Sequence, residues 1–278
     1  MTNIAIIGCG WVGKPLAHSL IRQGYNVTVS TRSRSSLDKA ISSGLAGFIC
    51  DLSHHCAIDE LTTQLRKNRV HVVIGAFPPG FRKGLGGEYA TYWSKLVTAA
   101  KQAKVTKIIM ISSTTVYPSR NATLSETDAS LTLAQGNPEF TENAVTMLKA
   151  EQKVIDSGLE YVIVRFSGLF GPDRHPARFV NKLKQISSSA PANMLHLDDA
   201  IGVNCFAIKE LSDQIINATS PDTVSKAEFY RAAVGTYHEA LSLPPLADIP
   251  DKRISAEKIR SLGYVFRYPN ATDGLKKC

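Results

Sequence analysis

Several features that define other classes of protein are scarce in this chain of 278 residues. No apolar run approaches the roughly 20 residues that a membrane-spanning helix needs, so no membrane association is expected. A buried strand is predicted to start at about residue 3, which leaves no room for a secretory leader. The five cysteines are odd in number and widely scattered, so we expect reduced thiols rather than a disulfide framework. These absences together predict a cytoplasmic protein.

Dense blocks of one charge are also absent, although the formal net charge is +8 at pH 7. Lysine and arginine are spread along the chain without an interleaved aromatic run, so nucleic-acid binding is not expected. A solvated basic surface explains the charge, and a phosphorylated coenzyme or an anionic substrate fits it as well. The hydrophobic content of 44% is typical of a globular protein with one large domain, or with a domain and an appendage.

The most informative motif lies near the start of the chain, where the apolar run Ile4–Ile7 leads into Gly-x-Gly-x-x-Gly and a helical pattern. Gly8 permits a tight turn, Gly10 lets the backbone approach a pyrophosphate, and Gly13 lets the new helix pack against the strand. The N-terminus of that helix offers free N–H groups and partial positive charge for phosphates. We therefore predict a dinucleotide site that contains Gly8, Gly10, Trp11, Val12 and Gly13.

Apolar, β-branched runs alternate with helical patterns along most of the chain. The strands are expected at 3–7, 26–30, 47–50, 70–75, 106–111 and 160–166, and the helices at 13–23, 36–43, 60–67, 88–103 and 141–157. Continuous hydrophobicity predicts strands covered on both faces, and hence an α/β fold with a doubly wound, parallel, Rossmann-like sheet. We expect an NAD(P)-binding domain at 1–165, rejoined by about 196–222, and a small C-terminal substrate lobe at 166–195 and 223–278.

The end of the second strand indicates which coenzyme binds. An NAD-specific site usually places a carboxylate there for the ribose hydroxyls. This sequence instead has Arg32 among the hydroxyls of Ser30, Thr31 and Ser33, with a second base at Arg34. This combination suits a 2′-phosphate and favours NADP(H) over NAD(H). The alternative is that Arg32 only extends along the sheet edge. The same arginine disfavours a methyltransferase-like site for S-adenosylmethionine.

Further coenzyme contacts are expected where the later strands end. The carboxylate after the third strand would lie beside the adenine amino group, and the segment after the fourth strand would form a wall against the adenine and ribose. The expected positions are Asp51 and Leu52 after the third strand, Ala76, Phe77 and Pro78 after the fourth, and Ser112 and Ser113 after the fifth.

Four further segments are similar to one family. They are Ile111–Tyr117 at the fifth strand, Arg165–Pro172 at the end of the sixth, Leu195–Ala200, and the C-terminal region Ile254–Tyr268. With the glycine motif, they resemble the extended short-chain dehydrogenase/reductases, which include the nucleotide-sugar epimerases and dehydratases. The resemblance spans nearly the whole chain. It implies hydride transfer at the nicotinamide C4, a serine or threonine at the position of Ser113, and a Tyr-x-x-x-Lys pair on the next helix.

The Tyr-x-x-x-Lys pair is missing from this sequence. None of the nine tyrosines is followed by lysine four residues later. One alignment of the helix places Asn143 and Met147 in the two catalytic slots, and a shift by two places Val145 and Lys149 there. Residues i and i+4 share a helix face, and neither register puts a phenol beside a lysine. The chain thus resembles the atypical members of the family, some of which act as redox sensors.

Another residue could take over proton transfer. Arg174, His175 and Arg178 lie where the family contacts its substrate, and they offer a group that titrates near neutral pH and two anion-binding side chains. We expect an oxidoreductase or epimerase/dehydratase-like enzyme acting on a small anionic molecule, with nucleotides and sugars as candidate sources. Ser113 and His175 are its candidate catalytic residues. The alternative is a non-catalytic NADP(H)-binding redox sensor or regulatory protein.

Two other clusters have simpler explanations. The run His54-His55-Cys56 has no second group of ligands nearby in the sequence, so no metal site is expected. Trp93 recurs with Tyr89, Tyr92 and Leu96 at helical spacing, which is typical of packing in a core or in a homodimer interface.

Overall fold

The protein forms two compact units in the computed structural model, which describes residues 1–84, 86–238 and 241–278. Unit 1 contains Met1–Val116, Glu142–Val164 and Asn204–Ile215, and unit 2 contains Tyr117–Thr141, Arg165–Val203 and Ile216–Cys278. No helix among the described residues is long and apolar enough to cross a membrane.

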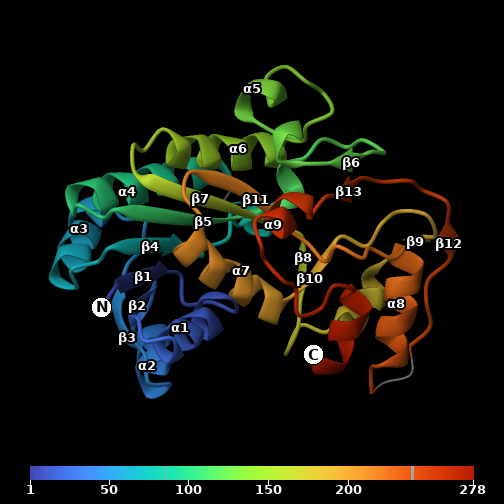
Figure 1. Ribbon diagram of the computed structural model, residues 1–278, viewed down its shortest axis with the longest axis horizontal. Helices are drawn as coiled ribbons and strands as arrows, with labels where there is room; N and C mark the ends of the chain where they lie inside the picture. Colours follow the sequence, from blue (N-terminus) through green and yellow to red (C-terminus); the bar gives the residue numbers. More distant parts are fainter. Residues whose placement is uncertain (85, 239–240) are drawn as a thin grey trace. The chain divides into compact units, whose positions relative to one another are not determined.

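A seven-stranded sheet carries the fold, in the order β11-β7-β5-β4-β1-β2-β3 (Figure 1). Its strands are β1 (Asn3–Ile7), β2 (Asn26–Thr31), β3 (Ala46–Ile49), β4 (Val72–Gly75), β5 (Lys107–Ser113), β7 (Glu160–Phe166) and β11 (Gln214–Ala218). The pairings among β1 to β5 are all parallel, with Ile7 opposite Ser30 on β2 and Gly75 on β4. The strand order reverses at β1, so the expected doubly wound α/β fold is confirmed.

Helices cover both faces of the sheet in unit 1. They are α1 (Gly13–Arg22), α2 (Arg34–Ser42), α3 (Ala57–Lys67), α4 (Tyr89–Gln102) and α6 (Glu142–Ile155), and α7 (Leu197–Glu210) ends in this unit. Figure 1 shows α3, α4 and α6 along one side of the sheet and α1 and α2 on the other. Tyr89, Trp93 and Leu96 of α4 are fully buried, as expected for core residues.

Unit 2 is built from short elements. It contains α5 (Leu131–Ala134), α8 (Lys226–Gly235) and α9 (Glu257–Ser261), with the paired strands β8 (Gly168–Phe170) and β10 (Met194–His196), β9 (Ile186–Ser187) and β12 (Leu246–Ala247), and β6 (Thr123–Leu124) and β13 (Arg253–Ile254). Phe170, Phe229 and Leu275 belong to its apolar core.

The units divide the chain differently from the expected domains. Residues 117–141 pack in unit 2 rather than with the sheet, because β6 pairs with β13 and the ammonium of Lys252 donates to the carbonyls of Tyr117 and Pro118 at 2.9 and 3.0 Å. Of the segment 196–222, only Asn204–Ile215 joins unit 1. The functional assignment of the two parts remains a prediction.

Candidate coenzyme and substrate sites

The glycine turn between β1 and α1 leaves room and hydrogen-bond donors for a ligand. Gly8 has φ +113°, and a Cβ on Gly13 would lie 2.1 Å from the carbonyl oxygen of Gly8, so both positions require glycine. A Cβ on Gly10 would meet no atom within 4 Å. In the described part of the chain, the backbone N–H groups of Gly10 and Val12 have no hydrogen-bond partner. Open space and free donors beside a helix N-terminus fit a pyrophosphate.

The hydroxyl groups at the end of β2 are already used within the protein. Ser30 is 2% exposed, and its Oγ accepts a hydrogen bond from the Gly8 N–H at 3.1 Å. Thr31 is also buried, and its Oγ1 donates to the carbonyl of Ser33 at 3.2 Å. Ser33 caps α2, because its Oγ accepts the N–H of Ser36 at 3.3 Å. The three hydroxyls thus form hydrogen bonds with nearby backbone groups of the turn and of α2.

Arg32 is the cation left available at this strand end. It is exposed, and it has no hydrogen bond or ion pair within the described residues. Arg34 differs, because its Nε contacts Asp38 Oδ1 at 3.0 Å. Asp51 lies close enough to be influenced by Arg32: the N–H of Ser53, then the Ser53 hydroxyl and the Arg32 charge, hold the pKa of the Asp51 carboxyl below its usual value. A carboxylate and a free guanidinium thus border the end of β2.

The loop after β3 is held by a lysine that the sequence pattern does not reveal. Asp51 Oδ1 accepts hydrogen bonds from the N–H and hydroxyl of Ser53 at 3.0 and 2.8 Å. Lys95 on α4 donates to the carbonyls of Leu52 and His54 at 2.8 and 2.9 Å. In the sequence, such a contact is indicated only by a lysine on the half-buried face of a helix, and this pattern does not predict which carbonyls the lysine will contact.

The segment after β4 rests on the aromatic core. Phe77 stacks on Trp93 with ring centroids 4.9 Å apart, and Tyr89 meets Phe77 edge-on at 5.8 Å. Ala76 is half-buried and Pro78 is exposed at this strand end. The indole of Trp93 fills the space beside Gly75, where a Cβ would lie 2.1 Å from the ring. The segment after β4, which is predicted to contact the adenine, is thus held in place by the packing of Phe77 on two buried aromatic side chains.

Two serines at the end of β5 have different environments. Ser112 is buried and donates to Glu151 Oε1 on α6 at 2.6 Å. Ser113 is half-buried, and its Oγ lies 2.9 Å from Thr115 Oγ1 and accepts the Thr115 N–H at 3.1 Å. Only Ser113 therefore presents a hydroxyl that a ligand could reach.

Glu151 ties α6 to the end of β5, because its Oε1 accepts the Ser112 hydroxyl at 2.6 Å. Which of the two alignments matches the slots of the missing pair stays a prediction. Met147 is 1% exposed, whereas Asn143 and Lys149 lie at the surface. No tyrosine occurs in α6.

Tyr117 does not replace the missing phenol, because its hydroxyl belongs to a buried network in unit 2. It donates to Asn217 Oδ1 at 2.6 Å and accepts from Arg165 Nη1 at 3.0 Å. Arg165 also donates to the carbonyls of Glu126 and Ala129 at 3.0 and 2.9 Å. Burial raises the pKa of Tyr117 to about 12. The network is a brace for the turn and loops of this unit.

The expected substrate loop also lies in unit 2. His175 is 8% exposed and begins the short helix Pro176–Lys182, with Nδ1 accepting the Ala177 N–H at 3.2 Å. Its Nε2 lies 3.4 Å from Thr236 Oγ1, and burial, followed by the charge of His238, lowers the pKa of His175. Arg174 and Arg178 are exposed, and Arg178 Nη1 donates to the carbonyl of Asp173 at 2.7 Å. Their roles in substrate binding stay predictions.

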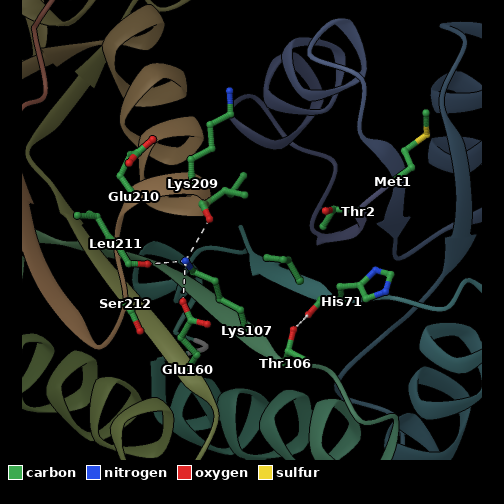
Figure 2. A pocket seen from close by; sticks show the side chains of 12 residues that line it. Met1, Thr2, His71, Thr106, Lys107, Glu160, Lys209, Glu210, Leu211 and Ser212 are labelled. Carbon is green, nitrogen blue, oxygen red and sulfur yellow. Dashed lines mark hydrogen bonds and ion pairs between the residues drawn. The ribbon is translucent and has the colours of Figure 1, made fainter.

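A cavity of about 480 Å³ lies in unit 1, on the opposite edge of the sheet from the glycine turn. It is lined by groups at the amino ends of the strands, including Thr2, His71, Lys107 and Glu160 (Figure 2). Coenzymes bind at the carboxyl ends in such sheets, where β1 leads into the glycine turn. Within the described residues, no group of three or more His, Cys, Asp or Glu side chains is placed to hold a metal ion.

Comparison with known proteins identifies the family. A family model described as NAD(P)H-binding matches residues 8–192. Protein YeeZ of Escherichia coli K12 is 28% identical over 283 aligned residues, which cover 97% of each chain. The UDP-Glc/GlcNAc 4-epimerase of Campylobacter jejuni has a TM-score of 0.79 at 17% identity, over 100% of this chain and 98% of that one. Bordetella bronchiseptica WbmH, solved with NAD⁺, has a TM-score of 0.77 at 15% identity, over 100% and 97%. The chain belongs to the NAD(P)H-binding family, with the fold of the NAD-dependent epimerases and dehydratases.

Proposed function

We propose that this protein binds NADP(H) in preference to NAD(H) and acts as an atypical short-chain oxidoreductase or epimerase/dehydratase-like enzyme on a small anionic molecule. The observation that carries the proposal is the pair of free N–H groups, on Gly10 and Val12, in the open turn before α1. Orphan donors at a helix N-terminus stabilise phosphate oxygens. The exposed, unpaired guanidinium of Arg32 supports the choice of the phosphorylated coenzyme.

The nicotinamide, when bound, supplies the hydride acceptor or donor. In the proposed site, Ser113 donates a hydrogen bond to the reacting oxygen of the substrate, and Arg174 and Arg178 bind its anionic group. His175 is the candidate for proton exchange. Its Nδ1 accepts the Ala177 N–H, so the neutral ring carries its hydrogen on Nε2, and proton uptake by the ring requires that the hydrogen bond to Ala177 opens. A nucleotide or sugar substrate is suggested by the C. jejuni epimerase, whose own substrates are UDP-linked sugars.

The coenzyme part is tested by titrating the protein with NADP⁺, NADPH, NAD⁺ and NADH while following the fluorescence of Trp11 and Trp93. We expect the phosphorylated forms to bind at least tenfold more tightly. Arg32→Asp should remove that preference, while Arg34→Ala, the matched control, should keep it because Arg34 is paired with Asp38. Absence of binding by all four coenzymes would refute the proposal.

The catalytic part is tested by a screen for turnover with NADP⁺ or NADPH and nucleotide sugars or other small anions. With a substrate in hand, Ser113→Ala should lower kcat by about a hundredfold, the usual scale for one donor to a developing oxyanion. His175→Asn keeps an acceptor for the Ala177 N–H and should lower kcat without unfolding the loop. Unchanged turnover in both variants would show that these roles are wrong.

A second candidate function, a non-catalytic redox sensor, is favoured by the surroundings of α6. Met147, which takes the lysine slot in one of the two alignments, is buried, and the Tyr117 hydroxyl bonds to Asn217 and Arg165. A ligand shifts a conformational equilibrium only through differential affinity for its states, so a sensor must distinguish NADP⁺ from NADPH in affinity or in induced shape. Equal affinities with identical small-angle scattering of the two complexes would exclude the sensor.

A further inference from the structure

Ser30 lies beside Arg32 at the end of β2, and the sequence pattern groups it with side chains that would face a 2′-phosphate. The structure directs its hydroxyl to the glycine turn instead. We propose that Ser30 is a positioning residue of the phosphate-binding turn, which supports the binding of every dinucleotide and contributes nothing to the choice between NADP(H) and NAD(H). This inference rests on the proposed coenzyme binding.

The geometry links Ser30 to the first residues of the turn. Ser30 is opposite Ile7 in the register of β1 and β2, so it is adjacent to the point where the chain leaves β1. Its Oγ accepts the Gly8 N–H at 3.1 Å, and its carbonyl accepts the Cys9 N–H at 2.9 Å. One residue of β2 therefore satisfies two consecutive donors of the turn.

On the side that faces β4, Gly8 is closely packed against the backbone of Ala76. A Cβ on Gly8 would lie 2.8 Å from the carbonyl oxygen of Ala76, and the Ala76 N–H donates to the Ile7 carbonyl at 2.8 Å. The turn therefore starts between the ends of β2 and β4, with little freedom to shift. Fixing its start also fixes the direction of the N–H groups that follow, on Gly10 and Val12.

Removal of the Ser30 hydroxyl would leave the Gly8 N–H without an acceptor. The turn would relieve that donor by moving, and the Gly10 and Val12 donors would move with it. Every dinucleotide carries the same pyrophosphate, so the loss of affinity should be the same for all four coenzymes. We expect about a tenfold increase in Kd, which corresponds to one hydrogen bond.

The experiment compares full-length Ser30→Ala with the wild type in titrations with NADP⁺, NADPH, NAD⁺ and NADH. All four Kd values should rise about tenfold, with the ratio of NADP⁺ to NAD⁺ affinity kept within twofold. Thr28→Val is the matched control, because Thr28 lies on the same strand and its buried hydroxyl has no hydrogen-bond partner among the described residues. Its affinities should stay at the wild-type values. Ser30→Thr keeps the hydroxyl and should restore binding.

A structural readout separates turn positioning from general weakening of the sheet. Amide hydrogen exchange should rise in residues 8–13 of Ser30→Ala, while the amides of β4 and β5 keep their protection. If alanine unfolds the protein, Ser30→Cys keeps the size with a poor acceptor and provides the same comparison.

Three results would overturn the inference. Selective loss of the phosphorylated coenzymes would place Ser30 at the 2′-phosphate, and unchanged affinity for all four would show that the turn is held without it. Both results leave the proposed coenzyme binding intact. Failure of the wild type to bind any coenzyme would instead remove the proposed function, and the inference with it.

Discussion

Lys107, at the start of β5, provides a test of how the end of α7 is held in unit 1. Its side chain is 8% exposed, and its ammonium donates to the carbonyls of Ile208, at 3.1 Å, and of Leu211 (Figure 2). It also pairs with Glu160 Oε1 at 2.9 Å. A cation at the last carbonyls of a helix satisfies acceptors that the helix itself leaves unpaired. Lys107→Met should therefore destabilise the protein while keeping most of the apolar packing of the lysine stem.

The magnitude follows from the surroundings of the ammonium. A hydrogen bond to a charged group contributes about 1.5–3 kcal/mol, and breaking a fully buried ion pair costs about 3–5 kcal/mol. The Glu160 side chain is 40% exposed and can be solvated once the lysine is gone, which puts the cost below that upper range. Removal of the lysine's own desolvation penalty offsets part of the loss. We expect a decrease of about 2–3 kcal/mol in the free energy of unfolding.

The assay is urea unfolding followed by circular dichroism, with the wild-type m-value as a check that the same transition is measured. Lys209→Met is the matched control, because Lys209 lines the same cavity but is exposed, and its effect should stay within about 0.5 kcal/mol. A cost below about 0.5 kcal/mol for Lys107→Met would refute the view that the ammonium anchors α7.

Three further predictions concern the turn, one helix end and the buried histidines. Gly13→Ala should destabilise the protein by about 1–3 kcal/mol, because its Cβ would lie 2.1 Å from the Gly8 carbonyl oxygen, whereas Gly10→Ala should leave urea unfolding unchanged and weaken only coenzyme binding. Lys104→Gly should stabilise the protein by about 0.5 kcal/mol in the same assay, because Lys104 follows α4 with φ +58°. Burial holds the pKa of His175 and of His196 below the ordinary 6.5, so their contribution to stability is complete above pH 6.5 and is lost as pH falls through the folded-state pKa values. Replacing both histidines with glutamine should make the urea midpoint less dependent on pH between pH 7 and pH 5. The same pH dependence in the variant and the wild type would contradict this account.

The sheet could be predicted closely because its strands are buried on both faces. β1 spans Asn3–Ile7 as expected, and β2 extends one residue beyond the predicted 26–30. A strand that is buried on both faces is apolar at nearly every position, so it can be located directly from the sequence. β4 starts at Val72 rather than at residue 70, because Val70 donates its N–H to Leu65 at the end of α3 and does not enter the sheet.

Unit 2 was much less predictable because its strands have only two or three residues and pair over long distances in the chain. Ser255 illustrates the difficulty. Serine is a preferred N-cap residue, and Ser255 lies two residues before the start of α9, but the observed N-cap is Ala256, while the Ser255 Oγ accepts the Glu257 N–H at 3.2 Å. The backbone N–H of Ser255 donates to the Leu124 carbonyl at 2.9 Å and so extends the pairing of β13 with β6, which delays the helix by one residue. The sequence around Ser255 does not predict a hydrogen bond to a strand so distant in the chain.

At the candidate site, the sequence shows which types of side chain are present, but it does not show which protein groups they already bond to. The hydroxyls near Arg32 have the composition of a phosphate pocket, yet Ser30, Thr31 and Ser33 each bond to neighbouring protein groups. Short polar side chains compete readily for nearby backbone groups, and the sequence does not say which partner they take. The structure thus reduces the expected polar nest to the guanidinium of Arg32.

The surroundings of Ser113 narrow the chemistry open to an enzyme built on this site. In the described part of the chain, α6 contains no tyrosine, and its two alignments offer either Asn143 with the buried Met147 or Val145 with the exposed Lys149 for the missing acid–base pair. Ser113 Oγ accepts the Thr115 N–H and lies 2.9 Å from the Thr115 hydroxyl, and among the described residues it has no hydrogen bond to a basic side chain. An alcohol without a base polarises a substrate oxygen and does not take its proton at neutral pH. A reaction that used Ser113 would therefore need its proton transfer from a separate group, such as water or an acidic group of the substrate itself.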